Sequence, residues 1–234
     1  MSDPVAASTV ILLRDGAGGL EVYLLRRVAA MTFAGGMTVF PGGKVDPSDH
    51  VGPADPIPAG WPAVLSADEA GTRALVRAAI RETYEETGVL LGGTPSETDR
   101  QALERHERSL ADVLPGLPAD LLRPWAHWIT PVGEPRRYDT RFFLAALPAG
   151  QHTRDVTGEA EVAEWVAPAE ALREHAAGAR PMLPPTVVTL RELTGFESVA
   201  AAWAAAAERR IEPILPTLRG SAAVLPGGES IGLS

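Results

Sequence analysis

The sequence predicts an α+β fold, or an α/β fold with a mixed sheet, in one domain spanning residues 1–234. First, strand-like runs rich in Val, Leu and Ile are separated by helix-like runs of unequal length. Second, 45% of the 234 residues are hydrophobic, which is enough for one sizeable core. Two wholly separate domains are therefore not expected.

The first part of the chain predicts strands followed by a long loop. Residues 5–14 and 20–27 flank the turn-forming segment DGAGG, which indicates a hairpin. A third strand is expected over 37–40. From 41 to 62 the chain holds repeated prolines, which exclude a helix or a central strand. Unstructured connections longer than about 12 to 15 residues are uncommon, so a loop here is itself informative.

A long helix is expected over residues 67–87. The segment SADE (66–69) fits a capping box that begins the helix at Ser66, and Gly88 is a natural stop. The proline-interrupted tail after 209 predicts an edge strand or irregular packing. The remaining expected elements are helices over 97–112, 168–178, 185–192 and 198–209, and strands over 136–147 and 162–167.

Composition excludes several classes of protein. The chain has no cysteine, so it has neither disulfides nor thiolate metal ligands. Its formal net charge is −9, whereas nucleic-acid binders usually carry a basic patch. No run reaches the roughly 18 apolar residues that a membrane span needs. We therefore expect a cytoplasmic protein with neither a nucleic-acid nor a membrane partner.

Negative charge gathers at the end of the long predicted helix. In RETYEETGV (81–89), Glu82, Glu85 and Glu86 fall within an arc of about 100°. These like charges repel one another and face the negative end of the helix dipole, which costs a few tenths of a kcal/mol per pair. A solvated acidic face is one interpretation. A hard divalent cation bound by several carboxylates is another, and it accounts for a locally unfavourable pattern.

Together with FPGG (40–43), this segment resembles the signature of the Nudix hydrolase family. Residues 81–89 match its second half, with Thr83 where an aliphatic residue is usual. The first half begins at Gly43, and Asp49 stands where the early glutamate is expected. Thirty-one residues (50–80) then precede Arg81 where the family has seven, an excess of 24 that splits the motif. The resemblance implies a Nudix-type α/β/α sandwich with an insertion at about 46–66 and extra C-terminal helices in an extension at about 180–234.

The resemblance also implies a mechanism, in which water attacks a nucleoside diphosphate-linked substrate with the help of Mg²⁺ or Mn²⁺. It implies that Glu85 and Glu86 are metal ligands and that Glu82 is a further ligand or the base. The carbonyl of Gly43 would complete the ligand set, and Arg81 would orient Glu82. Family members often use another glutamate from outside the motif. Here that position is taken by Glu159, with Glu161 as the alternative.

A second resemblance bears on the substrate. YLLRRVAAMTFAGGMTVFPGG (23–43) partly matches the motif of coenzyme A diphosphatases, and the split signature is similar to the branch that contains the peroxisomal ones. Coenzyme A or acyl-CoA is therefore the expected substrate. Arg27 and the pair Arg136 and Arg137 are candidates for its phosphates. Phe40 of FPGG and Trp61 of the insertion, the latter as part of an apolar lid, are further candidate contacts.

Several alternatives stay open. NADH or ADP-ribose could be the substrate, or the protein could be a catalytically silent Nudix module that binds a nucleotide. A calcium-stabilised protein using Asp46, Asp49 and Asp55 lacks the regular ligand spacing of a calcium loop. A homodimer is one assembly left open. The final Gly232-Leu233-Ser234 is not expected to act as a peroxisomal address.

Overall fold

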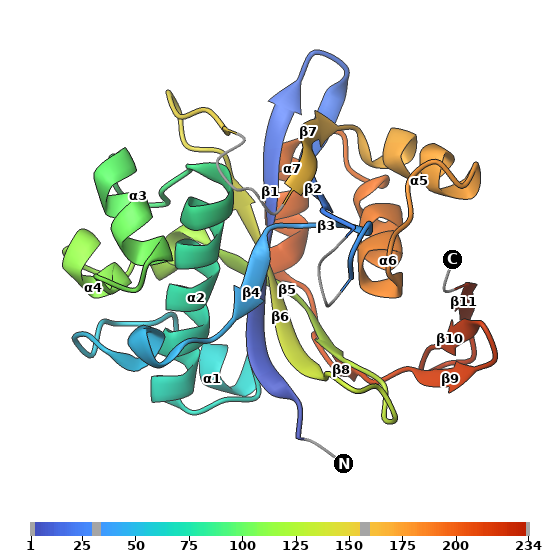
Figure 1. Cartoon of the computed structure of the whole chain (residues 1–234), viewed down its shortest axis with the longest axis horizontal. Helices are drawn as coiled ribbons and strands as arrows, with labels where there is room; N and C mark the ends of the chain where they lie inside the picture. Colours follow the sequence, from blue (N-terminus) through green and yellow to red (C-terminus); the bar gives the residue numbers. More distant parts are fainter. Residues whose placement is uncertain (1–2, 30–33, 155–159, 233–234) are drawn as a thin grey trace.

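A mixed β-sheet forms the middle of the molecule (Figure 1). The computed structural model describes residues 3–29, 34–154 and 160–232. The sheet has the strand order β3-β2-β1-β6-β5-β8, with β4 also paired to β1 and β7 paired to β2. Its strands are β1 (Val5–Gly16), β2 (Gly19–Arg27), β3 (Thr38–Val39), β4 (Gly42–Lys44), β5 (Arg123–Ile129), β6 (Tyr138–Ala146), β7 (Ala160–Val166) and β8 (Pro213–Ile214).

Parallel and antiparallel pairs coexist in this sheet. β1 runs parallel to β6, and β5 runs parallel to β8, while the remaining pairs are antiparallel. The mixed α/β sheet expected from the sequence is therefore confirmed. A separate small sheet, the C-terminal meander, consists of β9 (Thr217–Arg219), β10 (Ala222–Val224) and β11 (Ser230–Gly232).

Helices cover both faces of the sheet, giving three layers. Figure 1 shows α1 to α4 on one side and α5 to α7 on the other. None of the described helices is long and apolar enough to cross a membrane. The helices are η1 (Pro47–His50), α1 (Trp61–Val64), α2 (Glu69–Thr87), α3 (Glu97–Glu104), α4 (Leu110–Val113), η2 (Ala119–Leu121), α5 (Pro168–Ala176), α6 (Pro184–Leu193) and α7 (Val199–Ala207).

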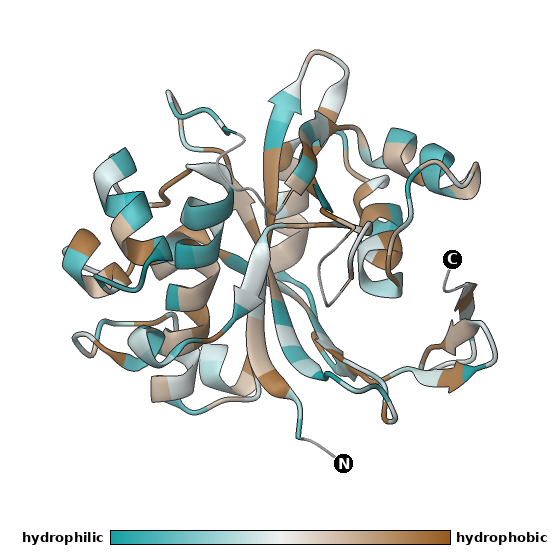
Figure 2. Ribbon diagram, viewed as in Figure 1, coloured by the Kyte–Doolittle hydropathy of each residue, from teal (hydrophilic) through white to brown (hydrophobic). Residues whose placement is uncertain are grey.

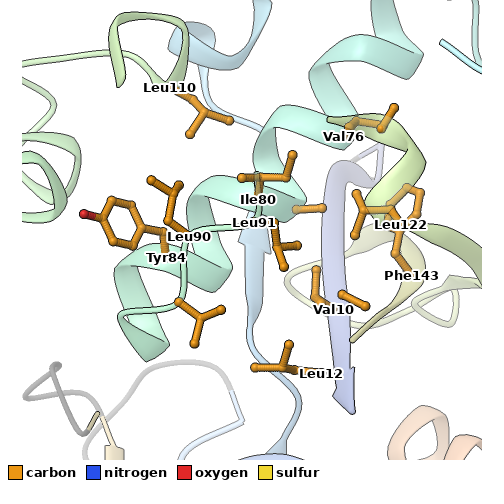
Figure 3. Packing of buried hydrophobic residues seen from close by; sticks show 14 of the residues in the cluster. Val10, Leu12, Val76, Ile80, Tyr84, Leu90, Leu91, Leu110, Leu122 and Phe143 are labelled. Atoms are coloured by element: carbon orange, nitrogen blue, oxygen red, sulfur yellow. The ribbon is translucent and has the colours of Figure 1, made fainter. Parts of the chain in front are cut away.

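Strand β1 explains why the core has two halves. Successive side chains of a strand point to opposite faces, so Val10 and Leu12 pack under α2 while Ile11 and Leu13 pack on the other face. Figure 3 shows Val10 nearer Ile80 of α2 and Leu12 farther along the strand. Because both faces are covered, the strand reads as a continuous apolar run. The hydrophobic colour in Figure 2 accordingly follows the middle of β1, whereas its hairpin end is hydrophilic.

Strand β5 was not expected from the sequence. Pro124 lacks the N–H that a central strand normally donates. The structure accommodates it at an irregularity, because the register between β5 and β6 shifts between Pro124 and Ala126. The strand then continues through His127 and Trp128, both buried. A local break in pairing therefore lets a proline lie inside the sheet.

Two predicted helix boundaries were wrong. Ser66 does not begin α2: its φ is +52°, and the backbone N–H donates to Ala63 at the end of α1. Asp68 is the cap, because its side chain accepts a hydrogen bond of 2.7 Å from the backbone N–H of Gly71. The helix expected over 97–112 is two helices, α3 and α4, separated by a turn in which His106 has a φ of +55°.

The C-terminal region is only partly helical. The expected helices correspond to α6 and α7, but residues 213–232 hold the short strands β8 to β11. β8 lies at the edge of the main sheet, paired with β5. An edge strand was one of the two predictions for the tail. The meander follows it and lies beyond α6 in Figure 1.

Candidate active site

The last turns of α2 bring three glutamates against strand β4. The helix ends at Gly88, whose φ of +74° closes it in the left-handed region that glycine tolerates. The backbone N–H of Gly42 donates to Glu86 at 2.8 Å. A Cβ added at Gly43 would lie 2.4 Å from Oε1 of Glu82. The carboxylate of Glu82 thus occupies the space that a Cβ would take at Gly43, whereas a Cβ at Gly42 would meet the backbone of β1 at Ser8 and Thr9.

Thr83 explains the one departure within the second half of the signature. The side chain is fully buried on the core face of α2, where an aliphatic residue would be expected. Its hydroxyl donates to the carbonyl of Ala79 at 2.7 Å, so the buried polar group is satisfied within the helix. The threonine therefore leaves the helix and its glutamates in place.

Arg81 lies at the centre of a buried charge network. Its Nε and Nη2 atoms donate to both carboxylate oxygens of Asp49, at 3.0 and 2.9 Å. Its Nη1 atom donates to Glu82 at 2.8 Å and to Glu85 at 3.0 Å. Burial alone would lower the pKa of Arg81, but these carboxylates raise it above its ordinary value. The guanidinium is therefore a fixed positive charge that orients Glu82 and Glu85.

The negative charges of Glu82 and Glu85 are only partly compensated by the single positive charge of Arg81. Burial raises the pKa of Glu85 to about 7, and the neighbouring Glu82 adds to this, although Arg81 opposes both effects. Burial likewise raises the pKa of Glu82. Oε1 of Glu85 is buried without a hydrogen-bond partner. A buried acceptor in this state is suited to a cation.

The donor set fits a hard divalent cation in chemistry, although the side chains do not yet converge on one point. Across the described ranges, no three Asp, Glu or His side chains are arranged to hold a metal ion. Glu82 and Glu85 turn towards Arg81, and Glu86 accepts from Gly42. All three offer the oxygen atoms that Mg²⁺ and Mn²⁺ prefer. Rotation of these carboxylates away from their present partners would expose that set.

The insertion supports this network through Asp49 and through its contacts with Arg77 of α2, and neither residue was predicted as a site residue from the sequence. Asp49 was placed at the early-glutamate position and considered as a calcium ligand, but it was not among the predicted catalytic or metal-binding residues; it is 1% exposed and binds Arg81. One turn earlier on α2, the buried Arg77 donates to the carbonyls of Asp49 and Pro53 and to Asp55. The alignment with the family signature was the one signal for Asp49, and nothing local indicated Arg77.

A second buried network fixes the junction between the insertion and α2. Arg141 of β6 donates through Nε to the carbonyl of Leu65 at 2.9 Å. Its guanidinium also pairs with Asp139, which contacts His127 on the neighbouring strand. The start of α2 is therefore tied to the sheet by side chains from β5 and β6.

A cavity of about 750 Å³ opens beside the carboxylates. It reaches from β4 and the end of α2, past β5 and β6, to the N-terminus of α6 and the C-terminal meander. In Figure 1, α2 and the meander lie on opposite sides of the sheet. The residues predicted from the sequence that line this cavity are Arg27, Phe40, Gly43, Arg81, Glu82, Glu85, Glu86 and Arg136.

Other predicted residues lie elsewhere. Trp61 does not line the cavity: it is 8% exposed and packs on Phe143 with ring centroids 6.1 Å apart, so the expected lid contact is wrong in this structure. Arg137 does not line it either, because its Nε donates to the carbonyls of Thr130 and Pro131 and holds the β5–β6 turn. Trp61 therefore packs in the core and does not contact a ligand in the cavity.

The position of the extra acidic residue remains a prediction. Glu159 lies outside the described residues. The alternative, Glu161 on β7, accepts a hydrogen bond of 3.3 Å from the backbone N–H of Ala29 and does not line the cavity. Glu134, on the turn between β5 and β6, does line it. No sequence motif marked Glu134.

The mixed sheet between two helical layers, with glutamates beside a glycine loop, defines a Nudix-type fold and site. The chain belongs to the NUDT19 Nudix domain family, whose model matches residues 63–193. A solved NUDIX hydrolase from Alicyclobacillus acidocaldarius superposes with a TM-score of 0.73 at 31% identity, covering 87% of this chain and 97% of that one.

Curated relatives agree with this family. The chain is 30% identical to "Putative nudix hydrolase 7" of Caenorhabditis elegans over 183 residues, covering 74% of this chain and 56% of the relative. It is 27% identical to "Acyl-coenzyme A diphosphatase NUDT19" of Gallus gallus, covering 89% of this chain and 72% of the relative. The chain thus spans about half to three quarters of the length of these relatives.

Proposed function

We propose that this protein is a Mg²⁺- or Mn²⁺-dependent hydrolase of a nucleoside diphosphate-linked compound, with coenzyme A or acyl-CoA as the substrate. The observation that carries the proposal is the set formed by Glu82, Glu85 and Glu86 against the glycines of β4. Nudix hydrolases generally use divalent metal ions. A silent module would have no use for this locally unfavourable acidic face.

The carboxylates and the carbonyl of Gly43 are the groups that would hold the cation. Such an ion supplies positive charge that offsets the diphosphate and lowers the pKa of a bound water. The residues of the chain do the rest. Arg81 orients Glu82 and Glu85, which both line the cavity, and Glu82 is the candidate for the base if it does not bind the cation.

Cationic groups at the cavity wall support an anionic substrate. Arg27 and Arg136 both line the cavity, and a guanidinium can bind phosphate oxygens through two parallel hydrogen bonds. Lys44, at the end of β4, lies beside the same cavity and is exposed. A diphosphate next to the glutamates would therefore meet positive charge from the chain itself as well as from a bound ion.

The glutamate that tests the proposal is Glu85. Purified protein is incubated with Mg²⁺ or Mn²⁺ and a panel of coenzyme A, acyl-CoA, NADH and ADP-ribose, and the products are separated by chromatography. Glu85→Gln keeps the size of the side chain but removes its charge. We expect kcat to fall by about 10²-fold or more, since single groups that stabilise charge in a transition state contribute on this order.

Glu69→Gln is the matched control, because Glu69 is a glutamate of the same helix that is exposed at its other end. Its activity should equal that of the unaltered protein. A loss below about threefold in Glu85→Gln at saturating metal would contradict the proposal. Preference for NADH or ADP-ribose over the coenzyme A compounds would keep the reaction and change the substrate.

A further inference from the structure

The C-terminal meander presents an apolar face to the cavity. Leu218 of β9 and Ala223 of β10 are directly paired across the two strands, so their side chains lie on the same face. Both residues line the cavity. Ala223 is 2% exposed, whereas Leu218 is 38% exposed, which leaves a large apolar side chain partly in water at the cavity wall. Such a side chain gains stabilisation if an apolar ligand covers it.

The N-terminus of α6 lines the same part of the cavity. Helix N-termini ordinarily offer free N–H groups, which makes them sites for anions. Here the first two helical residues are Pro184 and Pro185, which have no N–H. The N–H of Thr186 is used by the carbonyl of Leu183 at 3.0 Å. This helix end therefore provides no backbone donor among its first three residues.

The meander is fastened to the protein rather than hanging free. Glu229, just before β11, pairs with Arg191 of α6. Ile231 of β11 is 3% exposed and belongs to the buried cluster that includes Val187 and Leu190 of α6. The wall that Leu218 contributes is thus held at a fixed place relative to α6.

The chemistry of this wall favours some parts of a coenzyme A compound over others. An adenine needs hydrogen-bond partners for its ring nitrogens and amino group, and a phosphate needs donors or cations. The three prolines that line this part of the cavity, Pro184, Pro185 and Pro216, donate no hydrogen bond. An aliphatic chain needs none. Apart from the hydroxyl of Thr186, the described residues of this wall therefore suit the one portion of acyl-CoA that has no polar atoms.

We propose that the C-terminal meander and the N-terminus of α6 form a subsite for the acyl chain of an acyl-CoA, and that Leu218 sets the preference for acylated over free coenzyme A. This inference rests on the proposed function and deepens it, because it assigns one end of the cavity to the apolar end of the substrate. The diphosphate then lies towards Arg27 and the glutamates.

Leu218→Asp tests the subsite, and Leu215→Asp is its matched control. Leu215 belongs to the same tail and is 40% exposed, close to the value for Leu218, but it does not line the cavity. For each variant, kcat and KM are measured with octanoyl-CoA, coenzyme A and ADP-ribose. We expect Leu218→Asp to raise KM for octanoyl-CoA about tenfold, because lost apolar contacts in a binding pocket change selectivity by this order. KM for the two compounds without an acyl chain should stay within about twofold.

Binding is also measured directly, by calorimetry with octanoyl-CoA and coenzyme A on the metal-free protein. The unaltered protein should bind octanoyl-CoA more tightly, and Leu218→Asp should lose that difference. Equal effects on all three substrates, or equal effects of the two substitutions, would overturn the inference. If the unaltered protein hydrolyses no diphosphate, the proposed function fails, and the calorimetric comparison still decides whether the acyl subsite exists.

Discussion

The ion pair between Asp49 and Arg81 shows how much the insertion contributes to the site. Both oxygens of the buried Asp49 carboxylate accept hydrogen bonds from Arg81, and one also accepts from the backbone N–H of Asp46 at 2.8 Å. Asp49→Asn preserves the shape of the side chain and removes its charge. The new amide N–H₂ would face donor groups wherever it replaces one of these oxygens.

The size of the loss follows from what Arg81 retains. Removing one partner of a buried ion pair costs about 3–5 kcal/mol when the other charge is left uncompensated. Arg81 keeps Glu82 and Glu85 at 2.8 and 3.0 Å, so we expect the lower end, about 3 kcal/mol. In a domain of this size each kcal/mol lowers Tm by about 2–4 °C, which gives an expected drop of about 6–12 °C.

Urea unfolding at pH 7 with a chelator, followed by tryptophan fluorescence, measures this difference. Asp55→Asn is the control, because Asp55 lies in the same insertion but makes a single contact of 3.1 Å with Arg77. Arg77 keeps two backbone carbonyls, so the control should lose only about 1 kcal/mol. If Asp49→Asn loses no more than the control, the insertion does not support Arg81 in the way we infer.

Two further predictions concern the backbone of β4 and the network under α1. Gly43→Ala should lower kcat about 10²-fold with little change in Tm, because its Cβ would displace the flexible tip of Glu82; an unchanged kcat would contradict the close approach. Burial raises the pKa of Asp139, but hydrogen bonds from His127 and Arg141 outweigh burial and hold the pKa below its ordinary 3.8. The charged carboxylate therefore stabilises the fold above pH 3.8. This stabilisation is lost as the pH falls through the lower pKa of the folded state. Asp139→Asn should therefore unfold at lower urea than the unaltered protein at pH 7, with a difference that shrinks below pH 4; a constant difference would refute this.

The parts of the fold that depend on local pattern could be predicted from the sequence. The hairpin of β1 and β2 follows from two apolar runs around a glycine-rich turn, and α2 follows from its spacing and from Gly88. The start of α2 could not be predicted, because Ser66 is held by α1 and by Arg141, which lies 75 residues away. Capping rules use neighbouring residues in the sequence and therefore cannot predict such contacts.

The site divides in the same way. The glutamates of α2 follow from helical spacing, since residues three and four apart share a face. The burial of Trp61 depends on Phe143, and the wall formed by Leu218 depends on the path of the tail; both are contacts between distant segments. The sequence therefore indicated that the glutamates gather on one face of α2, while the walls around them required the structure.

The parallel pairing of β1 with β6 has a consequence for how the chain folds during synthesis. Val5 pairs with Tyr138, so 132 residues separate the two partners along the chain. At a synthesis rate of about 5–20 residues per second, β6 is synthesised roughly 7 to 26 seconds after β1, and one edge of the apolar strand β1 is unpaired during that time. An unpaired apolar strand edge is prone to aggregation. We therefore expect the nascent N-terminal half to depend on chaperones, which would cover that edge until β6 arrives.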